Sequence, residues 1–406
     1  MKQGWDLKNI AEIGTVFNGN SINAKVKKEK YTNLEEGLPY IATKDISYES
    51  VIDYNNGVKI PDKDKPSFKI AHPNTVLICA EGGSAGRKIA FTDQEVCFGN
   101  KLFALSTTEK VNSRFVYYYY FSPQFQEYFA SQLTGIIGGV SMAKFKNLKV
   151  PLPSPPEQQR IVEILDKAFV AIDKAKQNAE QNLRNAKEVF ENYLQGVFDD
   201  ETIQWDKFIL KDLLQEQPRN GWSPPLKYHS EIGIPVLTLS AVTGFEFDVK
   251  KCKYTTAPTD EASYYWLENG YLLISRSNTP ELVGHVAISN NIESPTIYPD
   301  LIMKMKPTKN LVSTSFLYYQ LRSSNLRKEI MMRAHGANPT MKKINKTDVQ
   351  SLPILLCDKE AQNQIVATLN QLLEKIKIME GIYQRKIISI QKLKKSILQK
   401  AFEGEL

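Results

Sequence analysis

Apolar side chains recur every three or four positions along two long segments of this chain. In the first segment they stand at positions 161, 165, 168, 172, 175, 179, 183, 186, 190, 193 and 197. In the second they stand at 365, 369, 372, 376, 379, 383, 387, 390, 397 and 401, and Lys394 fills the one remaining place in the series. This spacing is typical of helices that pair through an apolar stripe. It predicts two helices of about 40 residues, each roughly 60 Å long, packed against each other as an antiparallel coiled coil.

Both helices have a recognisable start. Ser154-Pro155-Pro156-Glu157 has the pattern of a capping box, with a proline at the first helical position, where no backbone N–H is needed. In the second segment Asp358 is the expected N-cap, but Ala361 stands where the glutamate of a capping box would be. The two stripes also share one irregular step of four residues, from 179 to 183 and from 383 to 387. An irregularity kept in register indicates internal duplication.

The segments before the helices repeat as well. Trp5–Ser21 resembles Trp205–Ser223, and Asn74–Thr92 resembles Asn269–Ser289, where each copy predicts a β-strand, a Gly- or Ser-rich turn and a second strand. The order of the matching pieces is preserved in both halves. The sequence therefore predicts an α+β protein in which two pseudo-symmetric α/β domains, 1–152 and 201–356, are joined by two helical segments, 153–200 and 357–406.

Composition fits a soluble protein with ordinary cores: 406 residues, 42% hydrophobic and 24% charged. The N-terminus lacks the apolar core of a signal peptide and no segment is apolar enough to span a membrane, so we expect a cytoplasmic protein. The four cysteines show no metal-binding or disulfide spacing. The net charge is +7, with roughly +4 in residues 1–150, +3 in 201–356 and −3 in 157–200. The basic excess lies in the globular halves, which favours nucleic acid as a partner.

Catalytic motifs are missing from the sequence. It has no [DN]PP[YF] motif of amino-methyltransferases and no GxGxxG after a strand. The stretch Gly82–Lys88 has the wrong spacing for a phosphate-binding loop, and none of the four histidines stands in a Cys/His or Ser/His constellation. These observations favour recognition and scaffolding over catalysis and leave metal sites unsupported.

Several of these segments resemble the specificity subunit of type I restriction–modification systems, and the resemblance covers nearly the full length. It rests on the Trp-Asp start of each half, the strand-turn pieces "SAGRKIAF" and "LVGHVAI", and the helix entries "VPLPSPPEQQRIVEIL" and "LPILLCDKEAQNQIVATL". It also rests on the two endings "LQGVFDDE" and "LQKAFEGEL". The resemblance implies that 1–152 and 201–356 are target recognition domains, each reading one half of a split sequence in double-stranded DNA. It implies that the helices set the spacing between the half-sites.

The same resemblance implies the partners. Two methyltransferase subunits would dock on the helices and methylate adenine with S-adenosylmethionine, and ATP-dependent restriction subunits would join them. S-adenosylmethionine, ATP and Mg²⁺ would then belong to the partners, with no cofactor, no metal site and no catalytic residue in this subunit. Two alternatives remain open from the sequence: a methyltransferase or nuclease that acts alone, and a stand-alone DNA-binding scaffold without restriction or methylation partners.

Candidate DNA contacts are the polar residues in loops that differ between the halves, because Arg, Lys and Asn side chains suit base edges and phosphates. In the first half these are Arg87, Lys88, Ser141, Lys144 and Lys146. In the second they are Arg276, Asn278, Arg333, His335, Asn338, Lys342 and Lys343. Because the loops differ, we expect the DNA target to be asymmetric.

Two further patterns have a structural interpretation. The tyrosine run 117–120 is expected to pack a domain helix onto its sheet. The pairs Lys27-Lys28 and Lys250-Lys251 are expected at solvated strand edges or at phosphates rather than at bases.

Overall fold

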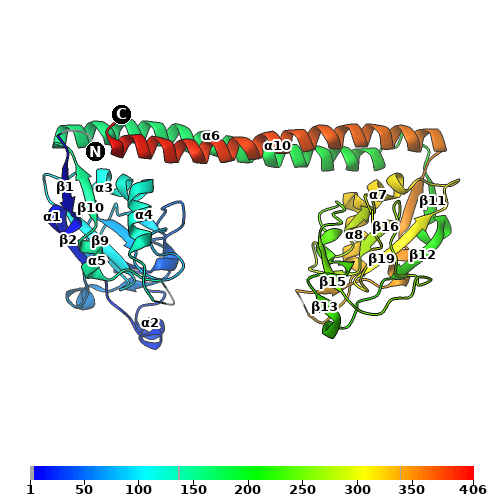
Figure 1. Cartoon of the computed structure of the whole chain (residues 1–406), viewed down its shortest axis with the longest axis horizontal. Coiled ribbons are helices and arrows are strands. Elements are labelled where there is room, and N and C mark those ends of the chain that lie inside the picture. The colour runs from blue at the N-terminus through cyan, green and yellow to red at the C-terminus, as the bar shows by residue number, and fades with distance from the viewer. Residues whose placement is uncertain (1–3, 136–137, 339) are drawn as a thin grey trace. The chain divides into compact units, whose positions relative to one another are not determined.

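The computed structural model describes residues 4–135, 138–338 and 340–406. The chain forms two compact units, which we call unit 1 (Met1–Glu180 with Gln384–Leu406) and unit 2 (Gln181–Tyr383). Each unit contains one globular domain of mixed strands and helices together with one part of both long helices (Figure 1). The predicted fold class, two similar α/β domains joined by a pair of long helices, is confirmed. The division into four segments by residue number stays a prediction.

Two sheets form the domain of unit 1. The first has the antiparallel order β2-β9-β6-β7, with bounds Gly14–Asn18, Leu102–Thr107, Val76–Cys79 and Ile89–Phe91. The second has the order β4-β3-β8-β5, with bounds Lys59–Ile60, Leu38–Ile41, Val96–Phe98 and Ile70–Ala71. A separate pair joins β1 (Asp6–Asn9) to β10 (Lys149–Leu152). The short helices are α1 (Ile10–Ile13), α2 (Ala24–Lys30), α3 (Ser113–Tyr120), α4 (Pro123–Ser131) and α5 (Met142–Lys146).

Unit 2 repeats this plan. Its main sheet has the order β12-β19-β16-β18, with bounds Leu214–Asn220, Ile302–Pro307, Leu272–Ser275 and Val286–Ile288. A second sheet is β13-β15-β14, with bounds His229–Ser230, Cys252–Thr255 and Ile234–Leu237. Two pairs complete it: β11-β21 (Asp206–Ile209, Pro353–Leu356) and β17-β20 (Ser277–Asn278, Lys342–Lys343). The short helices are α7 (Thr314–Arg322), α8 (Ser324–Arg333) and α9 (Lys346–Gln350).

The tyrosine run lies on α3, and three of its four side chains are buried in the core of unit 1. The helix packs on strands β6 and β7. Tyr120 is fully buried and stacks on Phe125 with ring centroids 4.3 Å apart. The prediction that this run packs a helix onto its sheet is confirmed.

The duplication extends to atomic detail. Gly19 follows β2 and Gly221 follows β12, and at both positions an added Cβ would lie 1.9 Å from the carbonyl oxygen of a neighbouring residue. Two buried glutamines near the helix starts also correspond. The Gln158 side-chain amide donates to the carbonyls of Pro153 and Lys110, and that of Gln362 donates to the carbonyls of Cys357 and Leu311. Matching contacts at matching places show that both halves have one fold.

The long helices are α6 (Pro155–Phe198) and α10 (Lys359–Glu403). The positions of both starts agree with the sequence prediction: Pro155 is the first residue of α6, and the Asp358 carboxylate accepts the backbone N–H of Ala361 at 2.9 Å. The capping box at Ser154 stays a prediction. Within unit 1 the helices run antiparallel. Arg160, near the start of α6, donates to the Leu406 carbonyl at 2.5 Å, whereas Asp173 pairs with Lys394 at 3.2 Å.

The predicted apolar stripe is wrong at two positions, Tyr193 and Met379. Tyr193 is 44% exposed, because the end of α6 turns the side chains of Phe190, Leu194 and Phe198 toward the core of unit 2. On α10, Met379 is 39% exposed. At Lys394, the neighbouring Leu393 does not take over the apolar place and is 50% exposed. Lys394 keeps it, with its ammonium 4.7 Å from the Phe169 ring centroid, since a lysine stem can cover apolar surface while its charge stays in water. None of the helices in the described ranges is long and apolar enough to cross a membrane.

Candidate nucleic-acid interface

In both units, the residue just after a central strand makes the same backbone hydrogen bond to a later segment of the domain. We call this shared backbone arrangement the frame. In unit 1 the carbonyl of Ala80, just after β6, accepts the N–H of Val140 at 2.9 Å. In unit 2 the carbonyl of Arg276, just after β16, accepts the N–H of Ile344 at 2.9 Å. The backbone therefore aligns Ala80 with Arg276, although the loop sequences around them share little.

The frame presents different side chains in the two units. The next residues of the strand segment are Glu81 and Gly82 in unit 1 and Ser277 and Asn278 in unit 2. Their partners across the pair are Gly139 and Gly138 in unit 1 and Lys343 and Lys342 in unit 2. Bases are distinguished by the donors and acceptors that reach their edges. One scaffold that carries an acid and glycines in one copy, and Arg, Asn and Lys in the other, is suited to reading two different sequences.

In unit 2 the predicted residues converge on the β17-β20 ribbon, which is narrow enough for a DNA major groove. Asn278 pairs with Lys342 in the ribbon, and His335 forms a bridge to Lys343 beside it. The Arg276 guanidinium forms no hydrogen bond or ion pair with the residues described here, so its donors are available to a ligand.

Arg333 and Asn338 are already engaged within the protein. The Arg333 guanidinium donates to the Ser351 hydroxyl at 2.7 Å and pairs with Glu329 at 3.2 Å. The Asn338 side-chain oxygen accepts the N–H of Thr340. Their predicted DNA contacts stay predictions, but the structure gives both residues a role in shaping the loop beside the ribbon.

In unit 1 two predicted cations meet at Tyr48, which the sequence did not single out. The Arg87 guanidinium lies 5.0 Å from the Tyr48 ring centroid and the Lys88 ammonium 5.2 Å. The Lys88 ammonium also donates to the carbonyl of Thr43 at 2.9 Å. Tyr48 is 52% exposed, so the aromatic ring and the two cations that lie over it face solvent.

The other three predicted residues of unit 1 lie on or beside α5. The Ser141 hydroxyl caps this helix by accepting the N–H of Lys144, as the side chain of Asn345 caps α9 in unit 2. The Lys144 ammonium lies 3.4 Å from the Gln132 carbonyl, and Lys146 is half-buried. Ser141 therefore has a structural task that its counterpart shares, and the structure does not bring these residues into the cluster around Tyr48.

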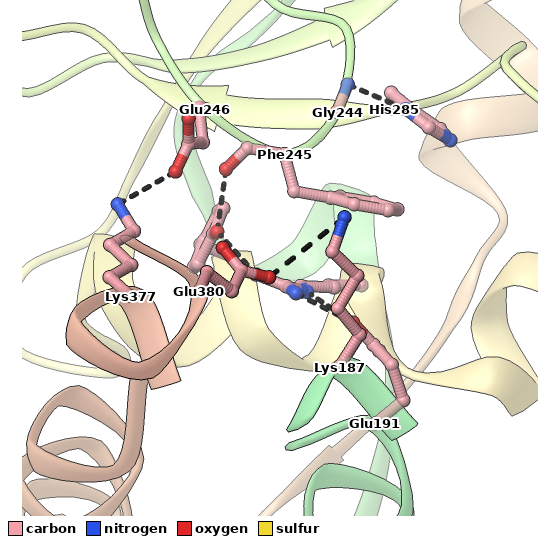
Figure 2. A network of polar contacts seen from close by, with 10 residues as sticks. Lys187, Glu191, Gly244, Phe245, Glu246, His285, Lys377 and Glu380 are labelled. Carbon is pink, nitrogen blue, oxygen red and sulfur yellow. Dashed lines mark hydrogen bonds and ion pairs between the residues drawn. The ribbon is translucent and has the colours of Figure 1, made fainter. Parts of the chain in front are cut away.

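A separate network fastens the domain of unit 2 to its helices (Figure 2). Phe245 adopts a left-handed backbone conformation, φ 64°, which is unfavourable for a bulky residue. Its carbonyl accepts the Tyr318 hydroxyl at 2.7 Å, and its neighbour Glu246 pairs with Lys377 of α10 at 2.8 Å. The surrounding contacts thus offset the strain and hold the loop against α10.

The Phe245 ring stacks on His285, with centroids 4.1 Å apart. His285 is buried, and its Nδ1 accepts the Gly244 N–H at 3.0 Å, so the ring proton sits on Nε2, which donates to the Glu281 carbonyl. Burial, and then the neighbouring guanidinium of Arg327, lower the pKa of His285 to about 4. The imidazole is neutral in the folded protein at neutral pH.

This gives unit 2 a pH-dependent stability. Because the folded pKa lies below the unfolded one, acid protonates the unfolded chain first, and stability is lost as the pH falls from about 6.5 to about 4. We expect His285 to contribute a slope of up to about 1.4 kcal/mol per pH unit there. Urea titrations followed by hydrogen exchange in unit 2 measure it. H285F keeps a ring against Phe245, and in this variant the contribution of His285 to the pH dependence of unfolding free energy should vanish. An unchanged pH dependence would contradict its assignment to His285.

Comparison with known proteins agrees with this architecture. The family model described as "Type I restriction modification DNA specificity domain" matches residues 2–181 and 202–385. The EcoKI specificity subunit of Escherichia coli K12 is 26% identical over all of this chain and 90% of its own length. The StySPI specificity subunit of Salmonella potsdam is 23% identical with the same coverage.

Two solved structures have the same fold. One, from work on complex assembly and conformational transition of the type I R-M system, superposes with a TM-score of 0.77 at 17% identity, covering 100% of this chain and 99% of that one. The HsdS subunit of Thermoanaerobacter tengcongensis gives a TM-score of 0.55 at 19% identity, covering 100% and 98%. With two matches of the family model that together span most of its length, this chain belongs to the type I restriction–modification DNA specificity family.

Proposed function

We propose that this chain is the DNA-sequence specificity subunit of a type I restriction–modification enzyme, in which each domain reads one half of an asymmetric, bipartite target. The observation that carries the proposal is the shared frame at Ala80 and Arg276. It holds two sets of chemically different side chains on one backbone geometry. Base contacts supply specificity in protein–DNA complexes, so the two sets call for two different half-sites.

The helices supply the second part of the proposal. Two methyltransferase subunits dock on the outward faces of α6 and α10, and restriction subunits join that complex. Large apolar side chains on these faces are exposed and suit a protein partner: Val170, Val189, Ile378, Ile382, Ile388 and Leu393. Catalysis then lies in the partners, with S-adenosylmethionine, ATP and Mg²⁺ bound there. The assembly acts on DNA in the cytoplasm.

The test is the methylation pattern of host DNA with and without this gene. We expect N6-methyladenine at one asymmetric split motif that disappears when the gene is deleted and returns when it is supplied again. Methylation that is unaffected by deletion would argue against the proposal. Sequence-specific DNA binding without any change in methylation would instead favour a stand-alone scaffold.

Arg276 is the residue of unit 2 best placed to read a base. Replacing it by alanine should weaken binding to the cognate duplex by about 1–3 kcal/mol, roughly 5- to 150-fold. Because a base contact is lost, one position of one half-site should also become degenerate in the methylated motif. K207A, which removes an exposed cation from β11, is the matched control and should change neither property. An R276A complex that methylates the same motif with unchanged affinity would remove Arg276 from the interface.

A further inference from the structure

Helix α2 is a basic helix with no buried face. Its seven residues, Ala24–Lys30, include four lysines and one glutamate, and none of them is buried. In Figure 1 it lies at the end of its domain opposite the long helices. From the sequence, Lys27-Lys28 was expected at a solvated strand edge or at DNA phosphates; the strand edge is wrong, because both lysines lie on this helix.

Helix α2 has few stabilising contacts of its own. The Asn23 side chain caps it by accepting the N–H of Lys25 at 2.9 Å, and three of its lysines lie in the last turn, where the helix dipole favours cations. A helix of this length is marginal in water, its lysines repel one another, and no apolar stripe offsets these costs. Within the described ranges, no ion pair joins its four lysines to an acidic side chain. The charge of α2 is therefore left without a counterpart in the protein.

The base of α2, by contrast, is firmly anchored. The following residue, Tyr31, is 8% exposed and packs edge-on against Phe68, with ring centroids 5.9 Å apart. The Thr32 hydroxyl donates to the Lys27 carbonyl at 2.9 Å, and the Lys27 ammonium lies 5.8 Å from the Tyr40 ring centroid. The helix thus presents its lysines from a fixed position rather than from a loose loop.

One segment connects α2 with the cations at Tyr48. Tyr40 contacts Lys27, and three residues later the Thr43 carbonyl accepts the ammonium of Lys88. Between Thr43 and Tyr48, Lys44 has a side chain that is 69% exposed. The segment Tyr40–Tyr48 thus has contacts with cations at both of its ends, and its own Lys44 lies 3.7 Å from the Asp45 carboxylate. We call these cations of unit 1 together the basic strip: Lys25, Lys27, Lys28, Lys30, Lys44, Arg87 and Lys88.

Unit 2 has no equivalent of α2 at the corresponding place. The segment 221–233, between β12 and β14, contains one lysine and one glutamate, and it forms a short 3-10 turn at Leu226–Tyr228 followed by the two-residue strand β13. The two units therefore differ at this place both in local structure and in charge. A strip that only one repeat carries is not required to build the domain.

We infer that the basic strip of unit 1 binds the phosphate backbone of DNA beside the half-site that this unit reads. This rests on the proposed function and goes beyond it by naming residues of unit 1 that bind the DNA backbone without reading bases. Lysines on a fixed helix suit a duplex backbone, whose regularly spaced phosphates release bound counterions when cations replace them. Such contacts add affinity for any sequence and leave the choice of bases to other residues.

The test measures DNA affinity of the full complex with its methyltransferase subunits as a function of KCl. One variant replaces all four lysines of α2 by glutamine (K25Q, K27Q, K28Q and K30Q). Each lost phosphate contact lowers the slope of log affinity against log salt by about 0.9, so we expect a reduction of about 2–4. Affinity at low salt should fall roughly 10- to 100-fold for cognate and unrelated duplexes alike.

Two controls separate charge from structure. The lysine-to-arginine variant at the same four positions keeps the charge and should keep the slope. E29Q removes the only acid of α2 and should change affinity in the opposite direction, toward tighter binding. Because α2 buries no residue, thermal unfolding should be the same in all variants, and complex assembly with the methyltransferase should be unchanged.

The outcomes are distinguishable. If the wild-type complex binds its target specifically and the glutamine variant keeps the same salt slope and affinity, the basic strip does not bind DNA phosphates. That result would leave the proposed function standing. A glutamine variant that fails to assemble with the methyltransferase would also overturn it, because it would make α2 a protein contact. A wild-type complex without sequence preference would instead reject the proposed function.

Discussion

Replacing Gly221 by alanine is expected to unfold the domain of unit 2. The new Cβ would lie 1.9 Å from the Tyr298 carbonyl oxygen and 2.5 Å from its carbonyl carbon. These are backbone atoms, and the next residue is fixed to the same carbonyl by the hydrogen bond from the Trp222 N–H at 2.9 Å. No side chain can rotate to relieve the contact. We expect a loss of about 3 kcal/mol or more in the free energy of unfolding.

Denaturant titration with hydrogen exchange, resolved by unit, measures this loss. G19A, whose Cβ would lie 1.9 Å from the Phe98 carbonyl oxygen, should give the same loss in unit 1. G196A is the matched control, because a Cβ there meets open space on α6. Removing a helical glycine should raise stability by about 0.5–1 kcal/mol. If G221A unfolds at the same denaturant concentration as the wild type, Gly221 does not lie as close to the Tyr298 carbonyl as the structure describes.

Replacing Phe402 by alanine should cost unit 1 about 3–5 kcal/mol, although this residue stands near the end of the last helix. Its ring is 3% exposed and packs edge-on against Phe115 and Tyr119 of α3, with centroids 5.1 Å apart in both pairs. Alanine would leave a cavity between α10 and the domain formed by the first part of the chain. The expected result is faster hydrogen exchange in α3 and an earlier unfolding transition of unit 1.

L393A tests whether the effect is specific to that contact. Leu393 lies on the same helix and is half exposed, so its truncation should change stability by no more than about 0.5 kcal/mol. Unit 2 should be unaffected by F402A, since Phe402 has no part in its core. An F402A protein with wild-type exchange in α3 would contradict the packing described here.

Much of the candidate site could be predicted only in outline. The candidate DNA contacts were chosen from loops that differ between the repeats, and the structure brings Arg276, Asn278, Lys342 and Lys343 together at β17 and β20. Their contact with DNA stays a prediction. Tyr48 was missed because a single tyrosine in a loop carries no pattern. Arg333 looked available, yet its guanidinium is held by Ser351 and Glu329. Sequence separates loops from core, but it cannot tell which loop cations already have partners.

The sequence by itself determined the duplication, the two long helices with their first residues, and the fold class, because these follow from periodicity and capping that are local along the chain. Only the tertiary structure decided the pairing of residues distant in sequence. It placed Phe402 in the core of the first domain, aligned Ala80 with Arg276, and put Lys27-Lys28, expected at a strand edge or at phosphates, on a basic helix. Such contacts depend on which surfaces fold together, and a local pattern of hydrophobic and polar residues does not specify them.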